Sequence, residues 1–239
     1  MKHSRHPSLH SDEWGKAIVL GLCLFLHCVP KLSAQIIATI NDPDGYTNLR
    51  KGPGTHTDIV GKVVEHEIFA LEEGGANHDG WLQLFDPYGR FIHSSRVVLI
   101  EKLPPLPSQI EGEQVSFTGP ETTITIRRQT FVAADHQIVR TASGFIYTID
   151  EGPVYGEDGG MPSNELAEIL IEREGQMISL PREALQFVYE IDLQWTRVYS
   201  DQKGKLFIVM HNSDGAGSYS VVWTLADGVY QGRKVLLLL

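Results

Sequence analysis

The sequence predicts an all-β protein: a small β-barrel, followed by a mostly antiparallel, β-sandwich-like domain with one short helix. Three observations indicate this fold class. Short runs of β-branched and aromatic residues alternate with turn residues in the first part, a proline-rich stretch follows residue 101, and longer apolar runs come after it.

Residues 1–34 are predicted to be a signal peptide rather than part of the fold. Basic residues precede the apolar run Ala17–Val29, and small residues lead up to Ala34. This order is typical of secretory leaders, so we expect cleavage before Gln35. As a helix the run would span roughly 20 Å, less than the ~30 Å hydrocarbon core of a bilayer. An uncleaved membrane anchor is the alternative.

The predicted mature chain is acidic and lacks cysteine. The leader holds four of the 20 basic and two of the 30 acidic residues, which leaves a net charge of −12. Both cysteines, Cys23 and Cys28, lie in the leader, which excludes disulfides and a thiol nucleophile from the mature chain. The acidic charge argues against a nucleic-acid partner and against an anionic membrane surface. We expect a periplasmic or secreted protein without stable membrane insertion after signal cleavage.

The barrel is expected to occupy residues 35–101. Turn sequences such as Asp42–Gly45, Lys51–Gly54 and Pro87–Gly89 separate short runs that favour strands. The expected strands cover residues 36–40, 59–64, 68–72, 81–85 and 91–93.

Four ordered motifs in this part carry a resemblance to a known family. They are Gly45–Gly54 with its N-x-R-x-G-P-G pattern, Ile59–Val63, Trp81–Leu84, and Gly89–Arg96 with its closing F-I-H-S-S. Together they resemble the bacterial SH3 domain over about residues 36–100. The resemblance implies an SH3-like barrel that serves as a binding module.

The candidate ligand-binding residues are aromatic: Tyr46, Trp81, Tyr88 and Phe91. Aromatic faces hold the apolar parts of peptides or sugars while polar edges form hydrogen bonds. The alternative for Trp81 is a place in the barrel core. We expect His93 to be a turn residue rather than a ligand or a base.

Strand alternation gives a further expectation for this part of the chain. Leu49 should point into the barrel, with Asn48 and Arg50 on the opposite face.

Residues 102–110 are predicted to form a proline-rich linker, because three prolines in four positions favour an extended, semi-rigid spacer. Two independently folded domains would then meet at a protease-sensitive boundary.

The domain at 111–239 is expected to be rich in β-strands. A hairpin is predicted at 218–235 with its turn at Asp227-Gly228. Residues 165–174 fit a helix or a strand, and the following Gly175 favours a hairpin. The best helix is 181–189, with proline in its first turn. Four stretches, 155–162, 178–181, 212–223 and 227–230, resemble C-terminal domains of uncharacterised secreted proteins of Bacteroidetes-type bacteria. This resemblance implies a compartment but no chemistry.

No catalytic motif was found. The sequence has neither a G-x-S-x-G elbow nor an H-E-x-x-H pair, and the histidine spacing suggests no metal site. We expect no cofactor. The acidic residues Asp150, Glu151, Glu157 and Asp158 could form a glycosidase-like pair or a solvated turn. The Gly- and Asp-rich loops at 156–160 and 212–217 match neither a phosphate loop nor an EF-hand, and a hairpin turn is preferred to an unspecialised calcium site.

We therefore predict an exported, non-catalytic binding module. Its SH3-like domain would recognise cell-wall peptide or glycan, or an envelope protein partner. The alternative is a hydrolase that acts on an envelope glycan or peptide through an acidic site in the C-terminal domain.

Overall fold

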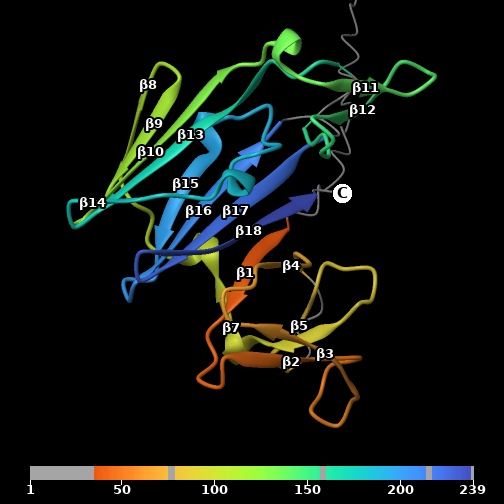
Figure 1. Cartoon of the computed structure of the whole chain (residues 1–239). Coiled ribbons are helices and arrows are strands. Elements are labelled where there is room, and N and C mark those ends of the chain that lie inside the picture. The colour runs from red at the N-terminus through yellow and green to blue at the C-terminus, as the bar shows by residue number, and fades with distance from the viewer. Residues whose placement is uncertain (1–34, 75–78, 157–159, 214–216, 238–239) are drawn as a thin grey trace, which may run out of the picture. The chain divides into compact units, whose positions relative to one another are not determined.

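The computed structural model describes residues 35–74, 79–156, 160–213 and 217–237, and it confirms the all-β fold class (Figure 1). Ser33–Leu239 form one compact unit. The predicted leader, its cleavage site and both cysteines lie outside the described residues. Among the residues described, no helix is long and apolar enough to cross a membrane.

Two small antiparallel sheets form the first part of the chain, in the strand orders β4-β1-β7 and β3-β2-β6-β5. Their strands are β1 (Ile36–Ile40), β2 (Tyr46–Arg50), β3 (Ile59–Val64), β4 (Phe69–Leu71), β5 (Trp81–Gln83), β6 (Phe91–His93) and β7 (Val97–Leu99). An isolated bridge between Leu71 and Leu84 joins the two sheets. Leu49 is buried in the core between them, whereas Asn48 and Arg50 are half-buried, as strand alternation predicts.

Two larger antiparallel sheets form a sandwich in the second part. One has the order β14-β13-β10-β9-β8 and the other β15-β16-β17-β18. Their strands are β8 (Ser108–Glu111), β9 (Gln114–Thr118), β10 (Thr122–Thr130), β13 (Asn164–Arg173), β14 (Gln176–Ile178), β15 (Thr196–Ser200), β16 (Lys205–Asn212), β17 (Tyr219–Ala226) and β18 (Val229–Leu237). Side chains of both sheets, including Phe117, Ile171 and Trp223, share one buried cluster. A separate hairpin pairs β11 (Ile138–Arg140) with β12 (Ile146–Ile149).

Two hairpins in the sandwich follow their predicted turn chemistry. For residues 165–174 the sequence left helix and strand open; in the structure 165–173 belong to β13, and Glu174-Gly175 turns the chain into β14. Both turn residues have positive φ, 52° and 75°. Asp227 and Gly228 do the same between β17 and β18, with φ of 50° and 77°. Paired positive φ is the backbone that two-residue hairpin turns require.

The helix expected at 181–189 is reduced to a single 3₁₀ turn, Arg182–Ala184. Side chains of the neighbouring sheet donate hydrogen bonds to the backbone carbonyls of this segment. Trp223 Nε1 donates to Ala184 O at 2.7 Å, and Arg233 Nη1 donates to Gln186 O. Phe187 has φ of 61°, outside the helical region. Contacts with residues far along the chain therefore override the local helix preference.

The proline-rich segment is extended, as predicted, but it is not a free spacer. Leu106 N donates to Val198 O at 2.8 Å, and Ser200 N donates to Pro104 O at 3.0 Å. These bonds flank a bridge between Pro105 and Tyr199. The segment thus lies along the edge of β15, the edge strand of its sheet.

A second buried cluster contradicts the expectation of two independent cores. It contains Ile37, Ala70 and Ile100 from the first part together with Phe207 and Val222 from the second. Buried apolar surface shared by two parts couples their stabilities. We therefore expect one folding unit.

Candidate functional site

The candidate site is a groove on the outer face of the sheet β3-β2-β6-β5. In β2 the side chains of Thr47 and Leu49 are buried, so those of Tyr46, Asn48 and Arg50 lie on the outer face. Trp81 pairs with His93 across β5 and β6, whose alternate residue Ile92 points into the core. Alternation along three short strands therefore brings one face of polar and aromatic side chains together.

These side chains and the neighbouring turns enclose a groove of about 360 Å³. Its lining consists of Asp42, Asp44, Tyr46, Thr47, Asn48, Arg50, Thr55, Trp81, His93, Ser95 and Arg96. The volume falls within the range of small-ligand pockets.

Trp81 forms part of the groove wall and is almost covered, with 8% of its surface exposed. It belongs to none of the apolar core clusters of the described residues. Polar partners cover its ring instead: His93 packs edge-on with 5.2 Å between ring centroids, and the Arg50 guanidinium lies 6.0 Å from the ring centroid. Trp81 therefore lies beneath the groove and outside the core between the two small sheets.

Charges of both signs line the groove. Arg50 Nη1 donates to Thr57 O at 2.6 Å, which fixes the guanidinium beside Trp81. At the other end Arg96 Nη1 donates to Asp42 Oδ1 at 3.0 Å, and Thr47 Oγ1 donates to Asp42 Oδ2 at 2.9 Å. The backbone N–H of Asp44, with help from these two side chains, holds the pKa of Asp42 below its ordinary value against a smaller effect of burial. Asp42 is therefore ionised at neutral pH.

Of the four aromatic residues predicted to bind ligand, the structure brings two into this groove. Tyr46, 38% exposed, lines it with Trp81, and Lys62 Nζ lies 3.8 Å from the Tyr46 ring centroid. Tyr88 stands on the β5–β6 turn, 77% exposed, outside the lining. Phe91 shares the outer face through its pairing with Arg50 but does not line the groove.

Several groove residues were missed as candidates by sequence reasoning. Alternation in β2 placed Arg50 on the outer face, so a signal for it was present. His93 was predicted to be a turn residue; in the structure it is the last residue of β6, its side chain caps the following 3₁₀ turn, and its ring lines the groove. No local signal pairs Asp42 with Arg96, which lies 54 residues away.

Of the four acidic residues considered for a hydrolase, the structure describes Asp150 and Glu151. Asp150 Oδ2 lies 2.7 Å from His136 Nδ1, and Glu165 Oε2 lies 3.4 Å from His136 Nε2. Burial alone would lower the pKa of His136, but the hydrogen bond with Asp150 and the charge of Glu165 outweigh it and raise that pKa. The imidazole thus separates the two carboxylates. Glu157 and Asp158 lie outside the described residues.

A second histidine, His211, lies between a serine and a glutamate as in a catalytic relay, but the serine is buried. His211 Nδ1 lies 2.8 Å from Ser220 Oγ, and His211 Nε2 lies 3.1 Å from Glu101 Oε1. Ser220 is only 1% exposed, so its hydroxyl cannot meet a substrate in this conformation. This chain of contacts ties Glu101 to β16 and β17.

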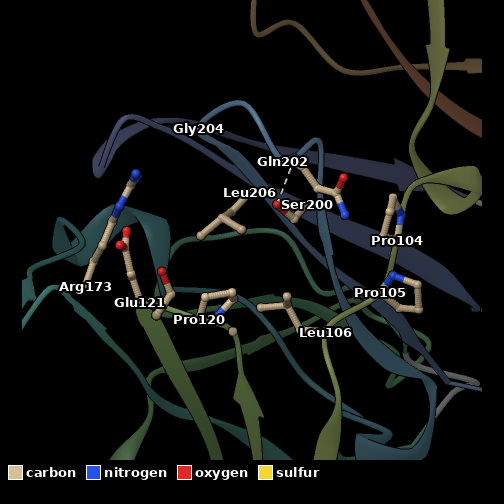
Figure 2. Close-up of a pocket in the computed structure, with 12 residues that line it drawn as sticks. Pro104, Pro105, Leu106, Pro120, Glu121, Arg173, Ser200, Gln202, Gly204 and Leu206 are labelled. Carbon is tan, nitrogen blue, oxygen red and sulfur yellow. Dashed lines mark hydrogen bonds between the residues drawn. The ribbon is translucent and has the colours of Figure 1, made fainter.

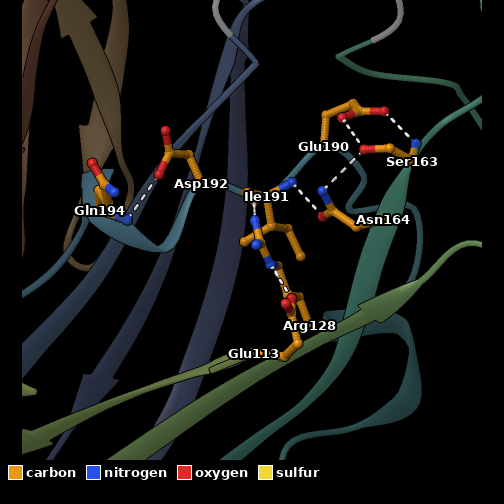
Figure 3. Close-up of polar contacts among 8 residues, drawn as sticks. All are labelled: Glu113, Arg128, Ser163, Asn164, Glu190, Ile191, Asp192 and Gln194. Atoms are coloured by element: carbon orange, nitrogen blue, oxygen red, sulfur yellow. Dashed lines mark hydrogen bonds and ion pairs between the residues drawn. The ribbon is translucent and has the colours of Figure 1, made fainter. Parts of the chain in front are cut away.

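A polar cavity of about 420 Å³ lies near Ile191, and Figure 3 shows the polar contacts around it. The polar side chains around it form hydrogen bonds with other residues of the protein. Arg128 donates to Glu113 and to Ile191 O, and Asn164 Oδ1 accepts from Ile191 N at 2.7 Å. Ser163 donates to Glu190 in the same network. We assign these contacts to holding the 190–194 segment in place.

Among the described residues, no group of three or more His, Cys, Asp or Glu side chains is placed to hold a metal ion. A scan against protein-family models, a search of curated proteins and a search of solved structures each found no match. The SH3 resemblance therefore rests on the motifs of the sequence.

Proposed function

We propose that this protein is an exported, non-catalytic binding module of the bacterial cell envelope that recognises its ligand through the groove of the SH3-like part. The ligand is cell-wall peptide or glycan, or an envelope protein. The observation that carries the proposal is the groove itself, which is lined by two aromatic rings, two arginines and an ionised aspartate from the sheet β3-β2-β6-β5 and the neighbouring turns.

The charges of the groove favour peptide over glycan. Arg50 is positioned to bind a carboxylate, and the exposed Asp44 at the other end of the groove suits an ammonium group. Cell-wall peptides carry both groups, whereas an uncharged sugar would use only the hydrogen bonds and the ring faces. Tyr46 offers an exposed ring for the apolar part of the ligand.

Co-sedimentation with purified peptidoglycan tests this proposal. Three variants with a single substitution each are compared with the parent protein. Tyr46→Ala and Arg50→Gln should weaken binding by about 1–3 kcal/mol each, the effect of losing an anchor side chain. Tyr88→Ala removes a more exposed aromatic ring outside the groove, so it should bind like the parent protein. Equal loss in all three variants, or no binding by the parent, would refute the proposal. Release of soluble fragments during the assay would instead favour the hydrolase alternative.

A further inference from the structure

A second cavity, of about 480 Å³, lies beside the proline-rich segment, away from the SH3-like groove (Figure 2). Three stretches of chain form it: Pro104–Leu106, the β9–β10 turn with Pro120 and Glu121, and the β15–β16 turn from Ser200 to Gly204. Arg173 at the end of β13 and Leu206 in β16 complete the lining.

Hydrogen bonds within the protein fix the walls of this cavity in the absence of a ligand. Pro104–Leu106 is bonded to β15, as described above. Gly119 N donates to Thr122 O at 2.7 Å across the β9–β10 turn. In the β15–β16 turn, Gln202 N donates to Ser200 Oγ at 3.0 Å. The three prolines of the lining have fixed φ angles. A preformed wall lowers the entropic cost of binding.

The cavity has an apolar middle and a charged end. Figure 2 shows Leu206, Leu106 and Pro120 in the middle, with Arg173 and Glu121 together at one end. Leu106 and Leu206 belong to or pack against the sandwich core, so their exposed surfaces are rigid. This middle suits an aliphatic side chain.

The charged end has unused hydrogen-bonding capacity. The nearest ion pair of Arg173 joins its Nε to Glu174 Oε1 at a long 3.8 Å. In the part of the chain that the structure describes, no hydrogen bond engages its two terminal guanidinium nitrogens. A guanidinium of this kind can bind a carboxylate through two parallel hydrogen bonds. The adjacent Glu121 carboxylate matches an ammonium group.

We infer that this cavity is a second ligand site, which takes a short unblocked peptide with aliphatic side chains. The carboxylate of the peptide binds Arg173, its ammonium group binds Glu121, and a side chain packs on Leu106 and Leu206. A simple anion fits less well because Glu121 and Glu174 repel it. A neutral apolar ligand leaves the charged end unpaired, which is costly once water is displaced.

An NMR titration of the ¹⁵N-labelled protein with the dipeptide leucyl-leucine tests this inference. The dipeptide should shift the amide resonances of Leu106, Thr122 and Gln202. Two blocked forms, the N-acetylated dipeptide and the dipeptide amide, should each bind about 10-fold more weakly, because each lacks one charge-assisted contact.

Arg173→Gln should weaken binding of the free dipeptide by about 10-fold, and it should no longer distinguish the free carboxylate from the amide. Lys203→Gln is the matched control, since it removes a positive charge from the neighbouring turn without changing the lining. The inference is wrong if both blocked forms bind as well as the free dipeptide. It is equally wrong if no shift occurs up to about 10 mM peptide, or if the shifts fall only in the SH3-like groove.

Discussion

Removing one hydroxyl group, in the variant Tyr219→Phe, should destabilise the C-terminal sandwich strongly. Tyr219 is fully buried, and its hydroxyl makes two hydrogen bonds with the backbone of Tyr189: it accepts from the N–H at 2.8 Å and donates to the carbonyl at 2.6 Å. Phenylalanine keeps the ring, so no large cavity forms. The variant instead leaves two buried backbone groups without partners, at about 1–3 kcal/mol each. The expected loss is about 2–6 kcal/mol of unfolding free energy.

Urea unfolding followed by tryptophan fluorescence measures this loss, and a thermal melt should show a decrease of roughly 5–15 °C. Tyr147→Phe is the control, because its side chain is 69% exposed. This control should change stability by no more than about 0.5 kcal/mol. A loss below about 1 kcal/mol for Tyr219→Phe would show that the hydroxyl does not hold the backbone of Tyr189 in place, and the reasoning would fail.

Three further predictions concern the rest of the chain. Because the pKa of His136 is raised in the folded state, its contribution to stability is complete below its unfolded pKa of about 6.5 and is lost as the pH rises through the folded value; urea midpoints across this range should show a decline that His136→Gln lacks, and an identical decline in the variant would contradict the assignment. Trp81→Ala should lose ~3–5 kcal/mol of folding stability, measured in the same assay, because the ring supports the groove; a stability equal to that of the parent would place the ring outside any packed environment. N-terminal sequencing of the exported protein should start near Gln35, and an intact Met1 on cytosolic protein would refute export.

Strand positions and hairpins could be predicted from local sequence because turn chemistry and alternation act over a few residues. Asp227-Gly228 and Glu174-Gly175 both adopt the backbone that their residue types favour. The segment 181–189 could not be predicted in this way. Its carbonyls bond to Trp223 and Arg233, which are about 40 residues further on, and no local pattern reports such partners.

The groove was predictable in part for the same reason. Alternation places Arg50 opposite Leu49, and the SH3-like motifs bring Tyr46 and Trp81 to the same region. The position of Tyr88 outside the groove could not be predicted, because the direction of the β5–β6 turn depends on the folded sheet. The association of Asp42 with Arg96 depends on the long-range antiparallel pairing of β1 with β7, which brings the residues just after β1 close to the residue just before β7.

The central claim is that the groove on the sheet β3-β2-β6-β5 binds a charged cell-wall peptide without altering it. An NMR titration with purified disaccharide-peptide fragments, and in parallel with the peptide-free disaccharide, tests this claim most directly. We predict that the peptide-bearing fragment shifts resonances of Tyr46, Arg50 and His93, leaves Tyr88 unchanged and is recovered intact. Shifts of equal size with the bare disaccharide, shifts confined to other parts of the protein, or cleavage of the fragment would contradict the claim.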